Sequence, residues 1–267
     1  MPAVVLITGA SSGIGKAIAE YLADRDYTVY GTSRNPKEKE LNGVHFLPLD
    51  VTQSDSIKNA VTLVLQRENQ IDFLINNAGK GIGGPLEEIP ESELKSIFET
   101  NYFGPINLIK EVLPVMREKR NGMIINVTSI AGFMGLPYRS AYSATKGALG
   151  LTTEALRMEL KEFNIRLTNV APGDFATNIA AGRYHVPLKQ QSPYAVNYGK
   201  SLKTMNEHVS DGAPPNLVAE AVYLIMQQPN PKVHYKVGAY MQRISVLLKG
   251  ILPSRLYERL LLNHYKL

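Results

Sequence analysis

The stretch AVVLITGASSGIGKAIAEYLADRDY, residues 3–27, decides the fold of this chain. Its first five residues are a continuous apolar run, as expected for a strand buried on both faces of a parallel sheet. TGASSGIG follows at once, and the remainder reads as a helix over 14–25. A strand, a glycine-rich turn and a helix in this order predict a dinucleotide-binding site.

The glycine-rich turn supplies the physical features that such a site needs. Gly9, Gly13 and Gly15 would allow a tight turn, close approach of the backbone and packing of the helix on the strand. The free N–H groups at the start of the helix would meet a pyrophosphate, because a helix N-terminus attracts anions. An ordinary Gly/Ser turn is the alternative. The predicted cofactor residues in this loop are Gly9, Ser11, Ser12, Gly13, Ile14 and Gly15.

A second pattern predicts proton transfer. Tyr142 and Lys146 stand four residues apart, and Ser129 lies upstream of both. Residues i and i+4 share a helix face. A tyrosine ordinarily titrates near pH ~10, but a nearby cation favours the phenolate and makes the side chain a usable acid or base. The pair alone would also fit a surface helix, so the interpretation depends on the glycine-rich start of the chain.

Five motifs occur in order: TGASSGIG, NNAG at 76–79, NVTS at 126–129, YSATK at 142–146 and APGDFAT at 171–177. Together they resemble the short-chain dehydrogenase/reductase family over roughly residues 3–225. The resemblance implies an α/β fold, a single-domain, doubly wound, Rossmann-like parallel sheet. It also implies an enzyme that transfers a hydride between a nicotinamide and a carbonyl or secondary alcohol.

The resemblance also implies roles for individual residues. Tyr142 would exchange the proton, Lys146 would bind the nicotinamide ribose, and Ser129 would hold the substrate oxygen. Asn101, in FETNYFG, would hold a water molecule of the proton relay; a satisfied buried amide is its alternative. The other implied cofactor contacts are Asp50 and Val51 near the adenine, Asn77, Ala78 and Gly79 near its ribose, and Pro172, Gly173 and Thr177 near the carboxamide. Asp50 fits a turn or a helix cap equally well.

The end of the second strand, GTSRNPKEKE, predicts the cofactor. An acid about 20 residues after the glycine-rich turn usually holds the ribose 2′-hydroxyl of NAD. Thr32, Ser33 and Arg34 occupy the discriminating positions, with no acid among them, and Arg34 would attract a 2′-phosphate. We therefore expect NADP(H). The alternative is that Arg34 is only a surface charge.

Composition narrows the classes of function. The 267 residues contain 44% hydrophobic residues and no cysteine, which predicts one globular α/β domain without disulfides. The five histidines lack close ligand spacing, so no metal site is expected. No signal peptide, membrane-spanning run or nucleic-acid motif is recognised, and a cytoplasmic location is expected.

The alternation of elements predicts a parallel sheet. The expected strands are 3–7, 27–32, 44–47, 71–75, 122–127, 165–170 and 234–238, and the expected helices are 14–25, 54–68, 91–118, 142–163 and 215–227. A cofactor-binding and catalytic region would span 1–230, with a substrate-covering lid at about 178–214. The long helices 91–118 and 142–163 match the family's pairing surface, which implies a homodimer or homotetramer.

Residues 231–267 would add the last strand and a basic amphipathic, helical tail to the same domain. This segment has seven basic residues and one acid, a net charge of +6. Such a helix can lie peripherally on an anionic membrane surface, or it can pack on the protein. Both interpretations stay open.

The tail resembles that of the hydroxysteroid, retinol and 3-ketosphinganine oxidoreductases. The sequence therefore indicates an NADP(H)-dependent oxidoreductase of a lipophilic small molecule, a steroid-like ketone or a long-chain 3-keto lipid. A soluble 3-oxoacyl-thioester or small-carbonyl reductase is the alternative enzyme. A non-catalytic NADP(H)-binding sensor or scaffold is an alternative of another class.

Overall fold

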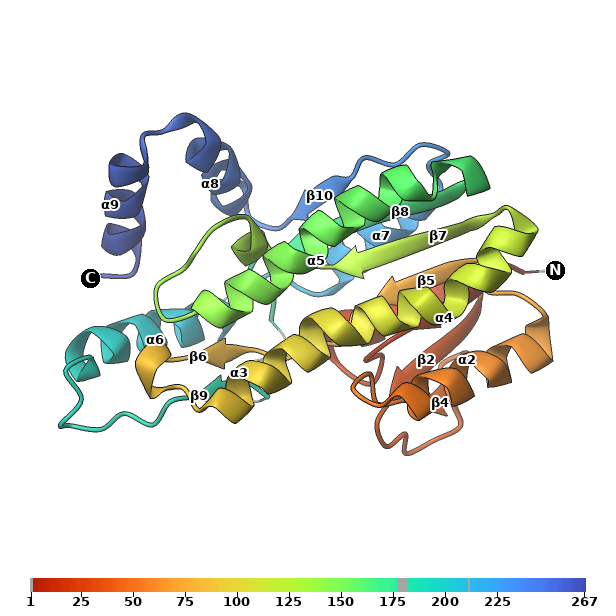
Figure 1. The fold of residues 1–267 in the computed structure, drawn as a ribbon, viewed down its shortest axis with the longest axis horizontal. Helices are drawn as coiled ribbons and strands as arrows, with labels where there is room; N and C mark the ends of the chain where they lie inside the picture. The colour runs from red at the N-terminus through yellow and green to blue at the C-terminus, as the bar shows by residue number, and fades with distance from the viewer. Residues whose placement is uncertain (1, 177–181, 211) are drawn as a thin grey trace.

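A computed structural model describes residues 2–176, 182–210 and 212–267, in which an eight-stranded sheet forms the centre (Figure 1). The strand order is β10-β8-β7-β5-β1-β2-β4-β3. All neighbours pair in parallel except β3 and β4, which are antiparallel. The strands are β1 (Val4–Ile7), β2 (Thr28–Ser33), β3 (Glu40–Leu41), β4 (Val44–Pro48), β5 (Phe73–Asn76), β7 (Gly122–Val127), β8 (Ile165–Pro172) and β10 (His234–Val237).

The order of the strands reverses beside β1. The chain runs from β1 to β2 and β4 on one side, and then returns to add β5, β7, β8 and β10 on the other. This confirms the predicted doubly wound sheet. Ligands of such sheets bind outside the carboxyl ends of the strands, at the point of reversal. The glycine-rich turn after β1 lies at this point.

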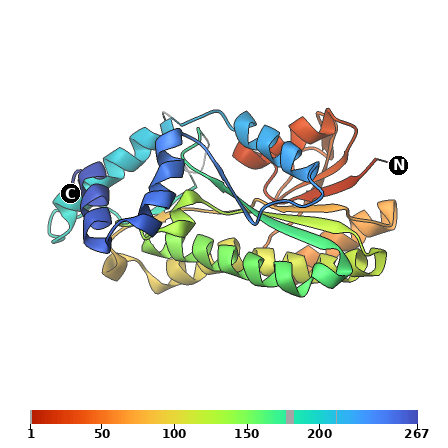
Figure 2. The ribbon, with the colours of Figure 1, turned by 90° about the horizontal axis from the view of Figure 1, so that it is seen from above.

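Helices cover both faces of the sheet (Figure 2). One face carries α1 (Gly13–Ala23) and α7 (Asn216–Met226), which pack on each other and on residues such as Val5 and Ile75. The other face carries α2 (Ser54–Glu68), α4 (Gly104–Lys119) and α5 (Ser140–Glu159). β1, β5 and β7 are buried along their whole length, which explains their continuous apolar sequences.

The seven predicted strands are all present, but the predicted helix 91–118 is interrupted. It consists of α3 (Glu91–Phe98), a π-helical turn over Glu99–Phe103 and α4. The predicted helix 142–163 comprises α5 and a separate 3₁₀ turn at Lys161–Phe163. Pattern reading missed these breaks because their residues continue the helical hydrophobic spacing.

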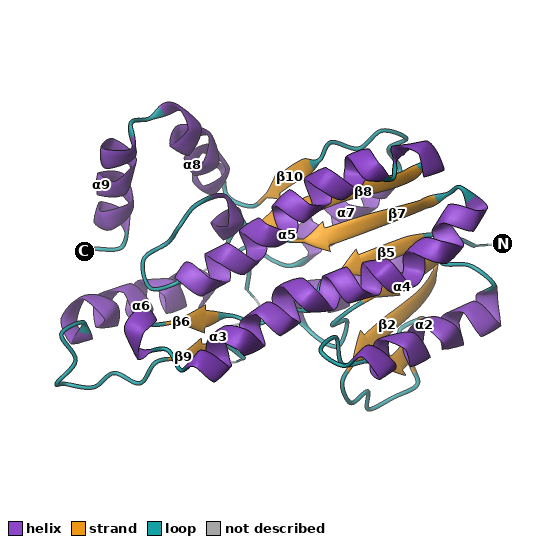
Figure 3. Cartoon of the chain, in the orientation of Figure 1, coloured by secondary structure: helices purple, strands orange, loops and turns teal. Residues whose placement is uncertain are grey.

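Further elements gather beyond the carboxyl ends of the strands, opposite the N-terminus (Figure 3). They are the two-stranded parallel sheet of β6 (Ile82–Gly83) and β9 (Tyr184–His185), and helices α6 (Ala195–Ser210), α8 (Tyr240–Ile251) and α9 (Ser254–His264). The predicted lid at 178–214 includes β9 and α6; its residues 178–181 and 211 lie outside the described residues. Across the described chain, no helix combines the length and apolarity needed to span a membrane.

Candidate active site

The glycine-rich turn joins β1 to α1 through backbone that favours glycine. Gly9 and Gly13 have φ angles of +66° and +56°, in the left-handed region. A side chain at Gly15 would collide with the Gly9 carbonyl and the Asn77 amide. Ser12 precedes α1 without a capping side-chain hydrogen bond, and the first turn of α1 contains no acid. The start of α1 therefore fits an anionic group such as a pyrophosphate.

Thr8 ties the NNAG segment to this turn. Its buried hydroxyl accepts hydrogen bonds from the backbone N–H groups of Asn77 and Ala78 at 3.0 and 2.9 Å. The Asn77 amide donates in return to the carbonyls of Thr8 and Gly9 at 2.9 and 3.1 Å. The carboxyl ends of β1 and β5 thereby form one rigid unit beside the reversal of the sheet.

Tyr142 and Lys146 lie on α5, where both side chains are buried. The Lys146 ammonium donates to the Val127 carbonyl at 2.8 Å. Burial lowers the pKa of Lys146, and the neighbouring Tyr142 acts in the opposite direction. The predicted pair therefore sits in a site of low solvent access, where charge interactions are stronger than in water.

Ser129 follows β7 and begins a 3₁₀ turn over Ile130–Phe133. Its buried hydroxyl accepts from the Ala131 N–H at 3.1 Å and lies 3.5 Å from the Pro172 carbonyl. These contacts fix the hydroxyl between the ends of β7 and β8. The carboxyl ends of these parallel neighbouring strands thus position Ser129 and the Pro172–Gly173 segment at the same edge of the sheet.

Asn101 occupies the π-helical turn between α3 and α4 and is fully buried. Its amide exchanges two hydrogen bonds with the Lys80 backbone, both of 2.9 Å, and donates to the Thr145 hydroxyl at 3.3 Å. A Cβ at Gly79 would lie 3.3 Å from the Asn101 oxygen and 3.5 Å from the Lys146 nitrogen. The polar ends of Asn101 and Lys146 therefore both lie close to Gly79. π-helical turns often occur at functional sites.

The cofactor-discriminating positions lie at the end of β2. The buried hydroxyl oxygens of Thr32 and Ser33 have no hydrogen-bond partner within the described chain, and Arg34 is exposed. Asp50 closes a turn after β4, because its carboxylate accepts from the N–H and hydroxyl of Thr52 at 2.9 and 2.8 Å. This is the turn role that the sequence left open; an adenine contact stays a prediction.

Pro172 ends β8, and Gly173 donates its N–H to the Val237 carbonyl at 2.8 Å. Thr177, the remaining predicted residue of this segment, lies outside the described residues. The tail meets the segment through Gln242 of α8. Its side chain contacts Gly173, donates to the Asp174 carboxylate at 2.7 Å and accepts from the Asp174 N–H at 3.3 Å.

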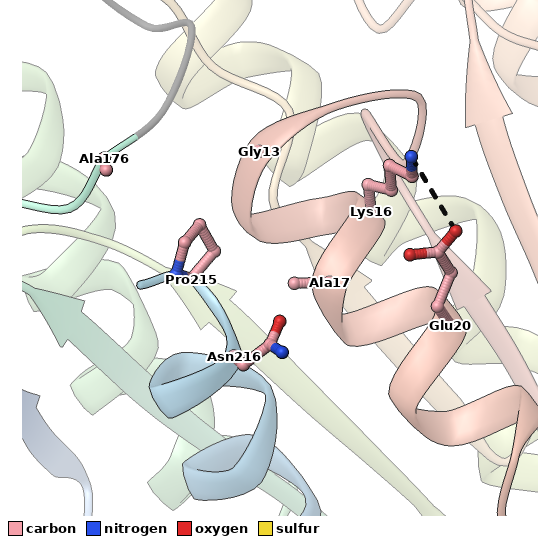
Figure 4. A pocket seen from close by; sticks show the side chains of 7 residues that line it. All are labelled: Gly13, Lys16, Ala17, Glu20, Ala176, Pro215 and Asn216. Carbon is pink, nitrogen blue, oxygen red and sulfur yellow. Dashed lines mark ion pairs between the residues drawn. The ribbon is translucent and has the colours of Figure 1, made fainter. Parts of the chain in front are cut away.

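An open pocket of about 270 Å³ borders the glycine-rich turn at Gly13 (Figure 4). It lies between the first turns of α1 and the start of α7, and Lys16 and Glu20 within it pair at 3.8 Å. Its lining residues are Gly13, Lys16, Ala17, Glu20, Ala176, Pro215 and Asn216. The pocket extends the predicted pyrophosphate site and does not include Tyr142 or Ser129.

The inner face of the tail packs on the turn that follows Ser129. Ile130, Met134 and Tyr257 form the buried centre of this cluster. The Tyr257 hydroxyl contacts the Met134 sulfur at 2.8 Å, and the Lys249 ammonium donates to the Phe133 carbonyl at 2.6 Å. The sequence indicated an apolar tail but could not assign its packing partner, which lies more than 100 residues earlier in the chain.

Comparison with known proteins identifies the family. The short chain dehydrogenase model matches residues 3–186, more than half of the chain. The chain belongs to the short-chain dehydrogenase/reductase family. It is an oxidoreductase of this family, a class of enzymes that acts on carbonyl and alcohol groups.

Relatives and solved structures of this family cover almost the whole chain. The chain is 41% identical to a 3-ketodihydrosphingosine reductase of Bacteroides thetaiotaomicron over 258 residues, covering 96% of each. A short-chain dehydrogenase structure from Streptomyces avermitilis has a TM-score of 0.83 and 31% identity, covering 99% of this chain and 97% of that one. A Burkholderia cenocepacia J2315 short-chain dehydrogenase in complex with NADP has a TM-score of 0.76 and 25% identity, covering 97% of each. The predicted family membership is confirmed.

Proposed function

We propose that this protein is an NADP(H)-dependent reductase of lipophilic ketones. The observation that carries the proposal is that Ser129, Tyr142 and Lys146 are all buried around the carboxyl end of β7. Lys146 bonds the Val127 carbonyl of that strand and interacts electrostatically with Tyr142, and the start of α1 suits a pyrophosphate. The nicotinamide would supply the hydride when bound. The residues of the protein would bind and orient the cofactor and the substrate, and would transfer the proton.

Tyr142 would donate its phenolic proton to the substrate oxygen as negative charge develops there. The Lys146 ammonium would stabilise the negative charge left on the Tyr142 oxygen. Ser129 would hydrogen-bond the same substrate oxygen and fix its position. Asn101 would support this arrangement through Thr145, the α5 residue that its amide contacts. In the oxidation direction, Tyr142 would take the proton instead.

The end of β2 supports NADP(H). The buried hydroxyls of Thr32 and Ser33 have no hydrogen-bond partner among the described residues, and a phosphate is a strong acceptor for such donors. Arg34 adds a cation, and no carboxylate follows directly to repel a 2′-phosphate. The Burkholderia cenocepacia relative was solved with NADP, which is consistent with this choice.

Two observations favour a lipophilic substrate. Tyr142 belongs to a buried apolar cluster that includes Ile82, Ala131, Val186 and Tyr198. The relative with 41% identity is a 3-ketodihydrosphingosine reductase. A long-chain 3-keto lipid fits both observations, and a steroid-like ketone fits the first. A soluble 3-oxoacyl-thioester or small-carbonyl reductase is the competing proposal.

The test is NADPH consumption with three substrates: a long-chain 3-keto lipid, a steroid ketone and acetoacetyl thioester. We expect turnover of one or both lipids at a kcat/KM well above that of the thioester. Turnover of the thioester alone would establish the competing proposal. NADPH binding without turnover of any carbonyl substrate would instead favour the sensor or scaffold function.

We further propose peripheral contact between the tail and an anionic membrane, at a cytoplasmic location. The two helices of the tail also expose large apolar side chains. They are Tyr240, Met241, Leu247, Ile251, Leu256, Leu260 and Leu262. Arg243, Arg255 and Arg259 are exposed on the same two helices. Apolar side chains flanked by cations suit a surface of acidic lipids.

A homodimer or homotetramer is proposed for the same enzyme. The outer surface of α5 and the adjoining π-helical turn exposes Phe103, Leu151 and Met158, with relative exposures of 44%, 67% and 73%. These apolar side chains suit a helix-to-helix contact with a second copy. Light scattering during size-exclusion chromatography would measure the assembly, and a monomer at micromolar concentration would contradict the proposal.

A further inference from the structure

One nitrogen of the Arg183 guanidinium is buried without a hydrogen-bond partner among the described residues. Its side chain is 8% exposed, and Nη1 has no hydrogen-bond partner. The carboxylate that interacts electrostatically with Arg183 is that of Asp174. Arginine is rarely buried this deeply unless it is paired, because a buried charge is costly. The unpartnered nitrogen therefore points to a ligand.

The backbone around Arg183 is fixed by strand pairing. β9 pairs in parallel with β6, and the Tyr184 N–H donates to the Gly81 carbonyl at 3.1 Å. A Cβ at Gly81 would lie 2.9 Å from the Arg183 Cγ and 3.1 Å from its Nε. The glycine thus leaves room for the arginine side chain to lie across the segment after NNAG. These contacts place Arg183.

His185 provides a second unpartnered nitrogen on the same side of the strand. Residues i and i+2 of a strand face the same way. The Nδ1 atom of His185 is buried and has no hydrogen-bond partner within the described chain. Burial, together with the Arg183 charge, lowers the pKa of His185. The Tyr198 hydroxyl bonds the Gly83 and Val186 carbonyls at 3.1 and 3.2 Å, which holds both strands in place.

A second guanidinium, that of Arg139, lies near this position and near Tyr142. The Arg139 guanidinium lies 5.0 Å from the centre of the Tyr142 ring. Arg183 interacts electrostatically with both Arg139 and Tyr142. The Asp174 carboxylate also interacts with it and favours its charged form. Asp174 also binds Gln242 of the tail. A substrate group placed here would meet two guanidiniums beside the predicted proton donor.

We propose that Arg183 and His185 form a subsite for an anionic oxygen group, a carboxylate or a phosphate, carried by the ketone substrate. A guanidinium binds such groups through paired, charge-assisted hydrogen bonds. The inference rests on the proposed reductase function and narrows it. The predicted substrate is a keto lipid that carries an acidic group.

The test is equilibrium binding of three ligands that cannot be reduced: dodecanoate, dodecyl phosphate and dodecan-1-ol, each below its micellar concentration. Titration calorimetry is done on the full chain saturated with NADP⁺. We expect the wild type to bind at least one anion more tightly than the alcohol. Arg183→Met should weaken binding of that anion roughly 10–100-fold, the loss typical of a hydrogen bond to a charged group. The affinity for the alcohol should stay unchanged. Comparison of the two anions distinguishes a carboxylate from a phosphate site.

Lys189→Met is the matched control, because it removes an exposed cation from the same segment. It should leave all three affinities unchanged. The proposal is overturned if the wild type binds the alcohol as tightly as both anions, a comparison that needs no variant. It is also overturned if Arg183→Met weakens all three ligands equally or weakens NADP(H) binding. Since no ligand is turned over, this result is independent of the ketone assay.

Discussion

Replacement of Thr8 by valine tests whether one hydroxyl holds the cofactor end of the site together. Valine matches threonine in volume, so the substitution leaves no cavity and removes only the acceptor. The backbone N–H groups of Asn77 and Ala78, now bonded at 3.0 and 2.9 Å, would lose their partner in a buried position. Each unsatisfied group costs about 1–3 kcal/mol. Partial relaxation reduces the sum, and we expect a loss of about 2–4 kcal/mol.

Urea denaturation measures this loss directly, because a domain is stable by only about 5–15 kcal/mol. The Kd for NADPH should rise in parallel, by about tenfold for each 1.4 kcal/mol that binding must supply to reorder Asn77 and Ala78. Thr62→Val, at an exposed position on α2, is the control and should stay within about 0.5 kcal/mol of the wild type. If Thr8→Val matches this control in both stability and NADPH affinity, the reasoning is refuted.

Four further predictions address chemistry, cofactor choice, the tail and the lid. Tyr142→Phe should lower kcat by roughly 10²–10⁴-fold and leave the Kd for NADPH nearly intact; full turnover would exclude the proposed mechanism. Arg34→Asp should shift the kcat/KM preference toward NADH, and an unchanged preference would remove Arg34 from the cofactor argument. Ile251→Glu should weaken sedimentation with phosphatidylglycerol vesicles by roughly 10–100-fold, since it removes about 1.5–3 kcal/mol of apolar burial, whereas Leu224→Glu, at an exposed position of the packed helix α7, should not. Burial raises the pKa of Tyr198 to about 12. Between pH ~10 and ~12 the folded state therefore keeps the phenolic proton of Tyr198, which the unfolded state loses. Stability should therefore fall between pH ~10 and ~12 by up to about 2–3 kcal/mol more in the wild type than in Tyr198→Phe; equal slopes in urea titrations would contradict this.

The sheet and its glycine-rich turn were predictable because local sequence determines them. A continuous apolar run such as Val4–Ile7 is typical of a strand that is buried on both faces of a parallel sheet. A turn with a positive φ angle at Gly9 favours glycine. The placement of Tyr142 and Lys146 on one helix was predictable too, because spacing alone puts residues i and i+4 on one helix face. Their catalytic roles stay a prediction. In each case the decisive contacts lie within about one helical turn or one strand.

The parts that sequence reading missed depend on contacts between distant segments. β6 and β9 are two residues each, too short for a pattern, and they pair across about 100 residues. Arg183 gains its position from that pairing and from Gly81, so its sequence neighbourhood gives no sign of a buried charge. The π-helical turn at Asn101 also follows from tertiary contacts, here with Lys80 and Thr145.

The structure separates the support of the cofactor end from that of the substrate end. The glycine-rich turn is held by Thr8 and Asn77, from the ends of β1 and β5. Ser129 is held by the turn whose residues Ile130 and Met134 pack against Tyr257 of the tail. A change in the tail therefore acts on the residue that would hold the substrate oxygen, while the pyrophosphate site keeps its own contacts.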